Sequence, residues 1–556
     1  MSLDAMAVGE LEMTESAVDP SIVRERFSAD QRALLEPYFT NTDLPVFGLV
    51  NLPETVKGAM FARYSRYRGT LRQMFLDEFA TDMDAASAAA FDGIEGDRAA
   101  DLYKRIFLGY GDDSVAQLGG AHIACEWVSN VLTKILQRGR LAAYLEQSTR
   151  YIAYDAPLDA GVSRGGVGGG YRYFRDAELG PAYEETMDFL FSTYSQSLPK
   201  VIAWVASEYP KGDADDDAAH MRAVKAKALD LMRGLLPASS LSHMGMFASG
   251  QAYESLLLHL AASPLPEAQR YGQMILGELQ KVIPSFVQRV DNPERGGRWV
   301  EHLQTLRHSS EQWADRLGIG EAEDESTVGP YVRLLHHEGD ERRLATSLLF
   351  EAASASEAQT QAAVADLDQT QLTALLADMV GDRENRRHRP GRGYESLRYR
   401  FEIVSDYGAF RDLQRHRMLT CQWQTLSPHL GAEIPSELDS AGVGDAFRTA
   451  LEASRAEYER LWDAGLQAQA PYALSLAYRL RYILDLNARE AMQLIELRSG
   501  REGHPSYRAV AHAMWDQINA IHPAVAGAMT HVDREMEPRL ERLMAEIRNE
   551  ERARGA

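Results

Sequence analysis

Apolar residues recur at three- and four-residue spacing along much of this chain, which is the pattern of amphipathic helices. In the N-terminal half this spacing predicts helices over about 56–79, 97–110, 181–209, 217–235 and 265–285. In the C-terminal half it predicts helices over about 440–466, 487–498, 504–521 and 524–549. A strand is indicated where Leu397, Tyr399, Phe401 and Ile403 alternate with polar residues. We therefore expect an α+β protein that is mostly helical.

Signals for turns and caps divide the chain. Ser405 or Asp406 can cap a helix that follows the predicted strand and runs to His416. The glycine-rich segment SRGGVGGG near Ser163 lacks the spacing of a dinucleotide-binding turn and predicts a flexible loop. The acidic, aperiodic stretch at 318–330 predicts a boundary. We accordingly expect an irregular or disordered N-terminus over 1–40, a first domain over 41–325 and a second over 326–556.

Composition excludes several classes of function. A chain of 556 residues is too long for one hydrophobic core, and its net charge of −22 argues against general nucleic-acid binding. No segment has the length and hydrophobicity of a membrane span or a signal peptide, so a cytoplasmic protein is expected. The two cysteines, Cys125 and Cys421, cannot form a disulfide framework, and no nucleophile is predicted at Cys421. The histidines lack the spacing of a metal site.

Two segments 277 residues apart resemble each other. The first reads LQRGRLAAYLEQSTRY, from 136 to 151, and the second reads LQRHRMLTCQWQTLSP, from 413 to 428. Each contains Arg-x-Arg, seven residues and then a hydroxyl, but the first has Gly139 where the second has His416. Such internal repetition predicts a duplicated domain.

Polar groups around these segments are candidates for an anion site. Arg415 and Arg417 flank His416 at a predicted helix end, and paired guanidinium groups suit phosphate or carboxylate. In an extended segment, Glu146, Ser148 and Arg150 would share one side. Taken alone, the first group also fits a solvated basic face, and the second a salt bridge within a loop.

Two further places differ between the halves. Near a predicted helix start, the second half has Asn487, Arg489, Gln493 and Arg498, where the first half has Ser249, Gln251 and Leu260. Conversely, Arg233 lies four residues before Pro237, whereas Pro471 stands at the matching place of the second half. On its own, Arg233 would more often be a surface charge. Each half therefore keeps polar residues that the other has lost.

At these residues the chain resembles the flavin-dependent thymidylate synthases, whose signature is Arg-His-Arg, seven residues and then Ser. The segment from Arg138 to Tyr151 is similar to that signature with its histidine lost, and Asn487 to Arg498 is similar to a later flavin- and nucleotide-binding helix. Ala62 to Ser65 and Gly111 to Gln117 are similar to earlier flavin contacts. The chain departs from the family at two places. Gln117 of the first half replaces a usual glutamate, which the second half keeps as Glu395. The usual glutamine three residues before the motif is replaced by Ile135 in the first half and by Asp412 in the second.

The resemblance implies two tandem thymidylate synthase-like domains that form a pseudodimer with one composite site. It implies FAD as cofactor, NADPH and methylenetetrahydrofolate as co-substrates, and conversion of dUMP to dTMP. It also implies a homodimer that mimics the family's homotetramer, without nucleic-acid or membrane partners. The implied catalytic residues are Arg498 and Arg415, and the implied substrate-binding residues are Glu146, Ser148, Arg150, Arg233, Arg415 and Arg498. The implied cofactor-binding residues are Ser65, Ser114, Arg415, His416, Arg417, Asn487, Arg489 and Gln493.

The resemblance divides these residues between the halves, because family members assemble each site from several subunits. Random decay would not leave one complete set shared by two incomplete halves. The reciprocal site, with Gly139, Trp423, Leu260 and Pro471, is expected to be inactive. Two alternatives remain at this point: a degenerate paralogue that binds flavin or nucleotide without turnover, and a flavoenzyme that acts on another pyrimidine nucleotide.

Overall fold

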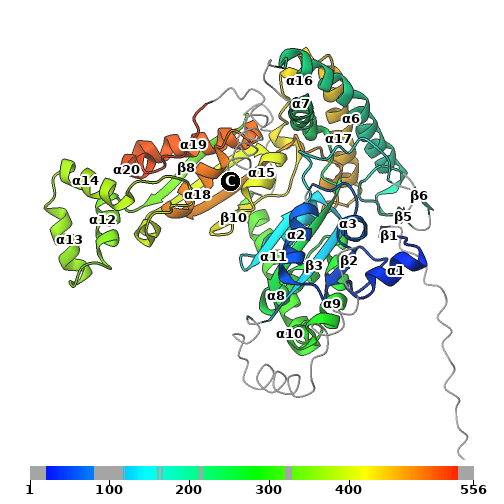
Figure 1. Ribbon diagram of the computed structural model, residues 1–556, viewed down its shortest axis with the longest axis horizontal. Helices are drawn as coiled ribbons and strands as arrows, with labels where there is room; N and C mark the ends of the chain where they lie inside the picture. Colours follow the sequence, from blue (N-terminus) through cyan, green and yellow to red (C-terminus); the bar gives the residue numbers. More distant parts are fainter. Residues whose placement is uncertain are drawn as a thin grey trace, which may run out of the picture.

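The computed structural model describes residues 21–64, 66–80, 117, 119–158, 162–164, 167–168, 170–211, 217–319 and 329–535. Two four-stranded antiparallel sheets organise these residues (Figure 1). The first has the order β2-β3-β7-β4 and the second β8-β9-β11-β10. The bounds are β2 Val46–Leu49, β3 Gly120–Ser129, β4 Ala142–Glu146, β7 Leu241–Ser249, β8 Tyr331–Glu338, β9 Arg398–Asp406, β10 Leu419–Trp423 and β11 Arg479–Asn487. Because chain order and strand order agree between the sheets, the structure confirms the duplicated α+β arrangement.

Each sheet carries the same strand, helix and strand around the repeated motif. In the first half β3 leads through α5 (Asn130–Leu136) into β4, and in the second β9 leads through α15 (Tyr407–Leu413) into β10. Ser129 and Asp406 cap the two helices by accepting a hydrogen bond from a backbone N–H in the first turn. The prediction of a strand followed by an Asp406-capped helix is therefore confirmed, although α15 ends three residues before His416.

Helices cover the sheets and form the ends of the molecule. In the first half they are α1 Ala29–Leu35, α2 Glu54–Tyr64, α3 Leu71–Glu78, α6 Gly180–Glu208, α7 Asp217–Met232, α8 Gly250–Ala261, α9 Pro266–Val282, α10 Pro284–Val287 and α11 Arg298–Leu317. In the second half they are α12 Glu341–Leu349, α13 Glu357–Ala365, α14 Gln369–Val380, α16 Glu437–Ser440, α17 Gly444–Asp463, α18 Ala488–Arg498, α19 Pro505–Ile521 and α20 Pro523–Gly527. Figure 1 shows α6 and α7 of one half beside α16 and α17 of the other, while α12–α14 form a separate end.

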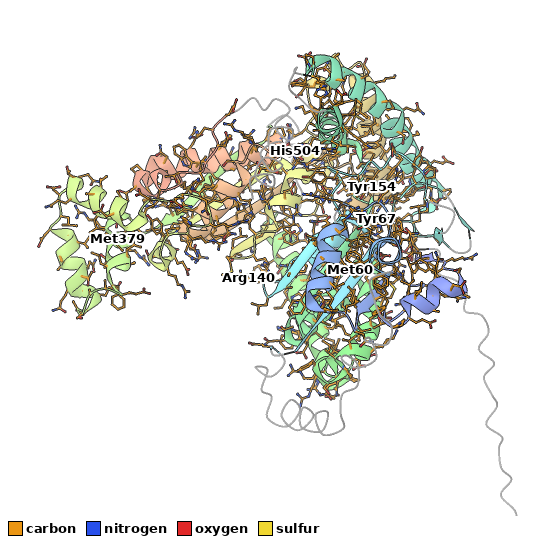
Figure 2. The ribbon with its side chains drawn as sticks, viewed as in Figure 1. Met60, Tyr67, Arg140, Tyr154, Met379 and His504 are labelled. Atoms are coloured by element: carbon orange, nitrogen blue, oxygen red, sulfur yellow. The ribbon has the colours of Figure 1, made fainter. Side chains whose placement is uncertain are left out.

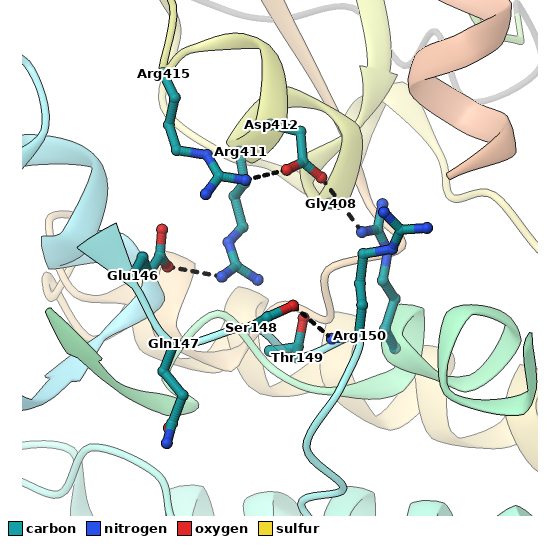
Figure 3. Close-up of a pocket in the computed structure, with 10 residues that line it drawn as sticks. Glu146, Gln147, Ser148, Thr149, Arg150, Gly408, Arg411, Asp412 and Arg415 are labelled. Atoms are coloured by element: carbon teal, nitrogen blue, oxygen red, sulfur yellow. Dashed lines mark hydrogen bonds and ion pairs between the residues drawn. The ribbon is translucent and has the colours of Figure 1, made fainter. Parts of the chain in front are cut away.

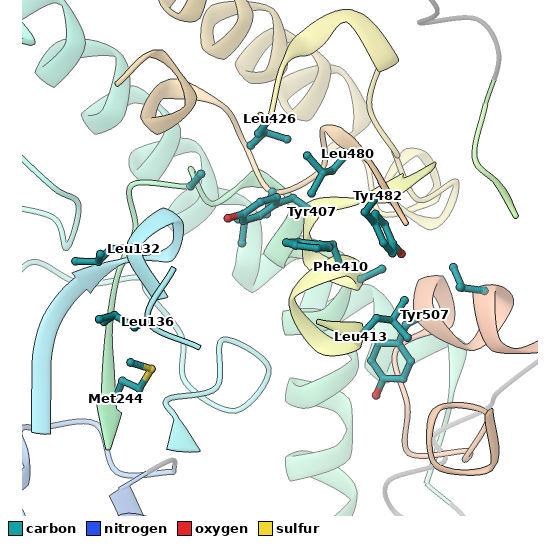
Figure 4. Packing of buried hydrophobic residues seen from close by; sticks show 14 of the residues in the cluster. Leu132, Leu136, Met244, Tyr407, Phe410, Leu413, Leu426, Leu480, Tyr482 and Tyr507 are labelled. Atoms are coloured by element: carbon teal, nitrogen blue, oxygen red, sulfur yellow. The ribbon is translucent and has the colours of Figure 1, made fainter. Parts of the chain in front are cut away.

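The two halves join through corresponding segments near a pseudo-two-fold axis. Pro237 and Ser475 form an antiparallel bridge. The N–H of Ala238 donates to the carbonyl of Leu474 (2.7 Å), and that of Leu476 donates to the carbonyl of Leu236 (2.9 Å). Buried side chains of both halves, including those in Figure 4, belong to one hydrophobic cluster. The junction is therefore a continuous core, which can hold side chains of both halves in fixed positions.

Several sequence-based expectations need correction. The helix expected over 56–79 is two helices, α2 and α3, and the side chain of Thr70 caps the second of them. The segment near Ser163 forms short strands, β5 (Val162–Arg164) and β6 (Val167–Gly168), because β5 pairs with β1 (Val23–Glu25). The helix expected over 524–549 begins as α20 and ends at Gly527, and residues 536–549 lie outside the described residues. The helix expected over 97–110 also falls there. No helix within the described ranges is long and apolar enough to cross a membrane.

Candidate active site

A small polar cavity lies between the two halves, below the loop that follows α15 (Figure 3). Its volume is about 40 Å³. The first half contributes the segment from Glu146 to Arg150, after β4, together with Arg233. The second half contributes Gly408, Arg411, Asp412 and Arg415, from α15 and the residues that follow it. The cavity therefore brings together five of the six residues predicted to bind the substrate: Glu146, Ser148, Arg150, Arg233 and Arg415.

Glu146 joins the two halves in the wall of this cavity. Lys134 Nζ and Gln137 Nε2 of the first half donate to its Oε2 atom at 2.9 and 3.0 Å. Arg411 Nη2 of the second half donates to its Oε1 atom at 2.7 Å. Burial alone would raise the pKa of Glu146, but Lys134, Arg411 and Arg415 hold it well below its usual value. Glu146 is thus a fixed carboxylate, while burial lowers the pKa of Lys134 to about 8.

Asp412 lies among arginines of both halves. Its carboxylate forms an ion pair with Arg415. Arg233 Nη1 lies 3.6 Å from its Oδ2 atom, and Arg498 Nη1 lies 3.9 Å from its Oδ1 atom. Although burial opposes ionisation, the arginines keep the pKa of Asp412 far below its usual value. Arg233 and Arg498, one from each half, therefore approach the same carboxylate, as a composite site requires.

The segment from Ser148 to Arg150 is a turn, so the prediction of an extended segment with one shared side is wrong here. Ser148 Oγ accepts a hydrogen bond from the N–H of Arg150 (3.2 Å), which bends the chain after β4. Arg150 Nε and Nη2 donate to the two oxygens of Asp230 at 2.8 Å each, and Nη1 donates to the Tyr507 hydroxyl at 3.1 Å. The turn still directs Ser148 and Arg150 to the cavity, because the chain bends around it.

A larger cleft of about 610 Å³ begins on the other side of Arg415. Its polar lining is strongly cationic: five arginines face it and only one carboxylate does. The charged and polar residues of the lining are Arg140, Arg389, Arg415, His416, Arg417, Glu490, Gln493 and Arg498. Arg140 lies where the two halves meet (Figure 2), and its Nη2 atom donates to the Thr420 hydroxyl at 3.0 Å. Arg415 is common to the cleft and the small cavity, so the two form neighbouring parts of one candidate site.

His416 links α18 to the loop that carries the arginines. Arg498 Nε lies 3.1 Å from His416 Nε2, and Glu490 Oε1 lies 3.0 Å from His416 Nδ1. Because a guanidinium can only donate, Nε2 must accept, and the ring proton is on Nδ1 and donates to Glu490. Burial, together with Arg498 and Arg415, lowers the pKa of His416. The imidazole is therefore neutral at pH 7 and orients Arg498.

The remaining cofactor-binding predictions have different outcomes. Gln493 and Arg417 line the cleft, and the Arg417 guanidinium also binds the Ala142 carbonyl. Asn487 lines an adjoining cavity, where its side chain caps α18 by accepting from the Glu490 N–H (2.9 Å). Arg489 lines neither cavity, because its Nε atom donates to the Pro390 carbonyl (3.1 Å). Ser65 and Ser114 lie outside the described residues.

The reciprocal positions hold no comparable group of charges. Arg138 is the counterpart of Arg415, and Trp423 is the counterpart of Glu146. The Arg138 guanidinium carbon lies over the Trp423 ring, 5.3 Å from its centroid, so a cation–π contact replaces the charged pair. Tyr144 donates to the Gly139 carbonyl (3.1 Å), and its hydroxyl lies where a side chain at 139 would begin. Leu260 is fully buried. The group of charges of the first site therefore has no equivalent at these described positions, and one site per chain stays a prediction.

Several residues that fix the predicted site residues were not predicted from the sequence. Lys134 and Arg411 fix Glu146, and Asp230 and Tyr507 fix Arg150. Arg411 offered a signal, because it lies four residues before Arg415 and one helical turn places both on the same side. Lys134 offered the same signal, because it lies four residues before Arg138. Asp230 and Tyr507 lie 80 and 357 residues from Arg150 along the chain, so only the tertiary structure shows their role.

Comparison with known proteins places both halves in one family. Residues 65–285 and 333–524 match a family described as thymidylate synthase complementing protein. A UPF0159 protein of Chlamydia muridarum is 37% identical over 521 residues, covering 91% of this chain and 96% of the relative. A UPF0159 protein of Thermoplasma acidophilum is 29% identical over 531 residues, covering 90% and 99%.

Among solved structures, the chain is similar to the UMP/dUMP methylase PolB from Streptomyces cacaoi, bound with 5-Br dUMP. The identity is 18%, and the match covers 38% of this chain and 98% of that one, with a TM-score of 0.30. A likeness this weak carries no argument about the site.

Proposed function

The chain belongs to the thymidylate synthase complementing protein family, and from this premise we propose that it is an FAD-dependent thymidylate synthase. It converts dUMP to dTMP with methylenetetrahydrofolate as one-carbon donor and NADPH as reductant, in one site built from both halves. One observation carries the proposal. Arg150 and Arg233 of the first half and Arg415 and Arg498 of the second converge around one small cavity that Glu146 and Ser148 also line.

In this proposal the small cavity receives the nucleotide phosphate. Arg233 and Arg415 supply guanidinium groups, which can bind phosphate oxygens bidentately. Arg150 lines the same cavity while it also holds Asp230 and Tyr507, and would add its positive charge to theirs. The Nη2 atom of Arg233 is buried and has no hydrogen-bond partner among the described residues, although Asp406 Oδ1 lies 3.9 Å away, so it could still donate to an anionic ligand. Ser148, which is partly exposed and lines the cavity, adds a hydroxyl as a further hydrogen-bonding group. Glu146 is held rigidly by three donors and would position the sugar of the nucleotide.

The larger cleft suits FAD, which carries a pyrophosphate. A volume of about 610 Å³ is typical of a cofactor site, and Arg140, Arg389 and Arg417 give it a cationic wall. Arg417, His416, Arg415, Gln493, Asn487 and Arg489 would hold or support the flavin, as would Ser65 and Ser114. The flavin supplies redox chemistry that side chains lack, while the protein supplies position and charge.

Arg498 would act at the junction of the cavity and the cleft. Negative charge develops on a uracil ring when it is activated for methyl transfer, and a fixed donor in a partly closed site stabilises such charge strongly. His416 fixes the Arg498 guanidinium through Nε, and the Nη1 atom lies 3.9 Å from Asp412 in the wall of the small cavity. The terminal nitrogens would therefore meet the ligand where the cavity and the cleft adjoin. Arg415, which lines both spaces, would contact the nucleotide and the flavin.

A second candidate function is supported by a specific observation. Asp412 and Asp230 already pair with the arginines that would bind the phosphate, so the site is partly satisfied without a ligand. A paralogue that binds flavin or nucleotide without turnover could have such a site. The two functions differ in product: only the synthase forms dTMP from dUMP, NADPH and methylenetetrahydrofolate.

We also propose that two chains form a homodimer that mimics a tetramer of single domains. The helix α11 has no buried residue and presents Trp299, Leu306, Trp313 and Leu317 to solvent. These residues recur at seven- and four-residue spacing, which is the spacing of a seam between two helices. The same face of a second copy would cover them. Light scattering should give twice the mass of 62.0 kDa, and Trp313→Glu should give the monomer mass.

The proposed activity has a direct test. The purified chain should show the absorption spectrum of bound flavin and should form dTMP in an NADPH-dependent reaction. Arg498→Ala should lower the rate of product formation about 10²–10³-fold while the circular dichroism spectrum stays unchanged. A protein that takes up neither FAD nor dUMP would exclude both candidate functions. Binding of both without product would favour the second.

A further inference from the structure

Asp412 occupies an unusual place for a carboxylate, in the wall of a cavity otherwise suited to an anion. It pairs with Arg415 and lies within 3.9 Å of guanidinium nitrogens of Arg233 and Arg498. The cavity of about 40 Å³ leaves little distance between this carboxylate and any anion that enters. A phosphate bound there would touch Asp412 as well as the arginines.

The surroundings keep Asp412 ionised. Arg415 follows it on the same segment, Arg233 approaches from the end of α7, Arg498 from α18 and Arg150 from the turn after β4. Other titratable groups nearby are Glu146, Arg411, Asp406, Asp230, His416, His504 and Tyr507. The pKa values of His504 and His416 are lowered by burial, so both imidazoles are neutral at pH 7. Among the described residues around Asp412 the arginines favour its ionised form, and an ionised carboxylate can only accept hydrogen bonds.

We propose that Asp412 makes this cavity selective for the singly ionised form of a phosphate monoester, whose remaining P–OH group donates a hydrogen bond to the Asp412 carboxylate. The proposal rests on the proposed function, because it assumes that the cavity receives a nucleotide phosphate. Two charges of like sign in contact would destabilise the complex with the doubly ionised form. The proton removes one ligand charge and converts the repulsive contact into a short, charge-assisted hydrogen bond.

The proposal predicts a particular pH dependence. The second ionisation of a phosphate monoester has a pKa of about 6, so the fraction of ligand that carries the proton falls roughly tenfold per pH unit above 7. From pH 6 to pH 7.5 the dissociation constant for dUMP should therefore rise about fifteenfold. This window lies below the pKa of Lys134, which is about 8.

Calorimetric titration of the FAD-loaded full chain with dUMP between pH 6 and 7.5 tests this. The wild type should show the fifteenfold weakening, and Asp412→Asn should show less than threefold, because an amide can donate to the doubly ionised phosphate. Asp230→Asn is the matched control. It also removes a carboxylate that pairs with a cavity arginine, Arg150, but the Asp230 carboxylate itself does not line the cavity. The variant should bind dUMP more weakly at every pH, because Arg150 is less well held, and should keep the wild-type slope.

A second ligand tests the proton itself without any change to the protein. The methyl ester of dUMP carries one negative charge on its phosphate but has no P–OH group. It should bind wild-type protein at least about tenfold more weakly than dUMP at pH 6, since it lacks a hydrogen bond to a charged acceptor. Its dissociation constant should not change with pH in this window.

Three results would overturn the assignment: a wild-type change below threefold, an Asp412→Asn variant with the wild-type slope, or equal binding of ester and dUMP at pH 6. Each would leave the proposed function standing, because dUMP would still bind. Absence of dUMP binding at every pH would instead overturn the proposed function, and the role of Asp412 with it.

Discussion

Replacement of Glu146 by glutamine should weaken the junction of the two halves. The glutamine is nearly the same size, so the change removes charge rather than volume. In the wild type the carboxylate is 3% exposed and pairs with Lys134 and Arg411, which are 1% and 10% exposed. The variant leaves both cations buried without their counter-ion. Removing one partner from a buried ion pair costs about 3–5 kcal/mol of unfolding free energy.

Part of this cost depends on pH, and its sign follows from Lys134. The pKa of Lys134 is about 8 in the folded wild type, below its ordinary value of 10.5. Without Glu146 the pKa falls further, so at pH 7 the folded variant must release the proton. At one unit below a pKa of about 8, this costs about 1.4 kcal/mol. At pH 9 the wild-type amine is already neutral, so this share of the destabilisation disappears.

Urea unfolding at pH 7 and pH 9, followed by fluorescence, measures the effect. Glu146→Gln should unfold at a lower urea concentration than the wild type, with the larger difference at pH 7. The control is Glu452→Gln on the exposed side of α17, which should change the unfolding free energy by less than about 0.5 kcal/mol. If Glu146→Gln matched this control at pH 7, Glu146 would not be the buried link between halves that the structure describes.

Further predictions address individual parts of the site. Arg415→Ala should abolish dUMP binding, whereas Arg138→Ala at the corresponding first-half position should leave it unchanged. Calorimetric titration of both variants compares them, and an equal loss of affinity would contradict a single site. Arg498→Ala should lower the rate of dTMP formation about 10²–10³-fold, the cost of removing one preorganised donor, and a smaller loss in single-turnover assays would exclude that role. Tyr507→Phe should weaken dUMP binding about three- to tenfold through the lost hydrogen bond to Arg150, with circular dichroism as control. Acidification from pH 7 to 5 should withdraw the stability that His416 contributes, because folding lowers its pKa and the unfolded chain binds that proton; His416→Gln should therefore lose less stability over this range than the wild type, as urea midpoints measure.

The sequence predicted the repeated parts of the fold well, because local signals specify them. Alternating apolar and polar residues from Leu397 to Ile403 mark β9, and Asp406 at the end of this strand caps the helix α15 that follows. Residues close together in the sequence therefore specify both the strand and the helix. Long amphipathic helices such as α6 and α9 were predicted within a few residues. The break between α2 and α3 was missed, because Thr70 acts as a cap only where the chain already turns.

Site residues could be predicted at positions where the two halves differ in sequence. They could not be predicted where contacts between distant segments determine a residue's role. Arg233 and Arg498 could be selected because the matching positions hold Pro471 and Leu260. Asp412 was visible only as a departure from a family pattern. Its role follows from the arginines of four separate segments that meet around it, which no local pattern encodes. The turn at Ser148 shows the same limit, since a hydrogen bond within three residues overrode the alternation.

The stoichiometry of dUMP binding tests the composite site most directly. Calorimetric titration of the FAD-loaded full chain should give one nucleotide per chain, and Arg233→Ala in the first half and Arg498→Ala in the second should each weaken binding at that same site. Two nucleotides per chain, or binding that only one of these variants affects, would contradict a single site shared by the two halves.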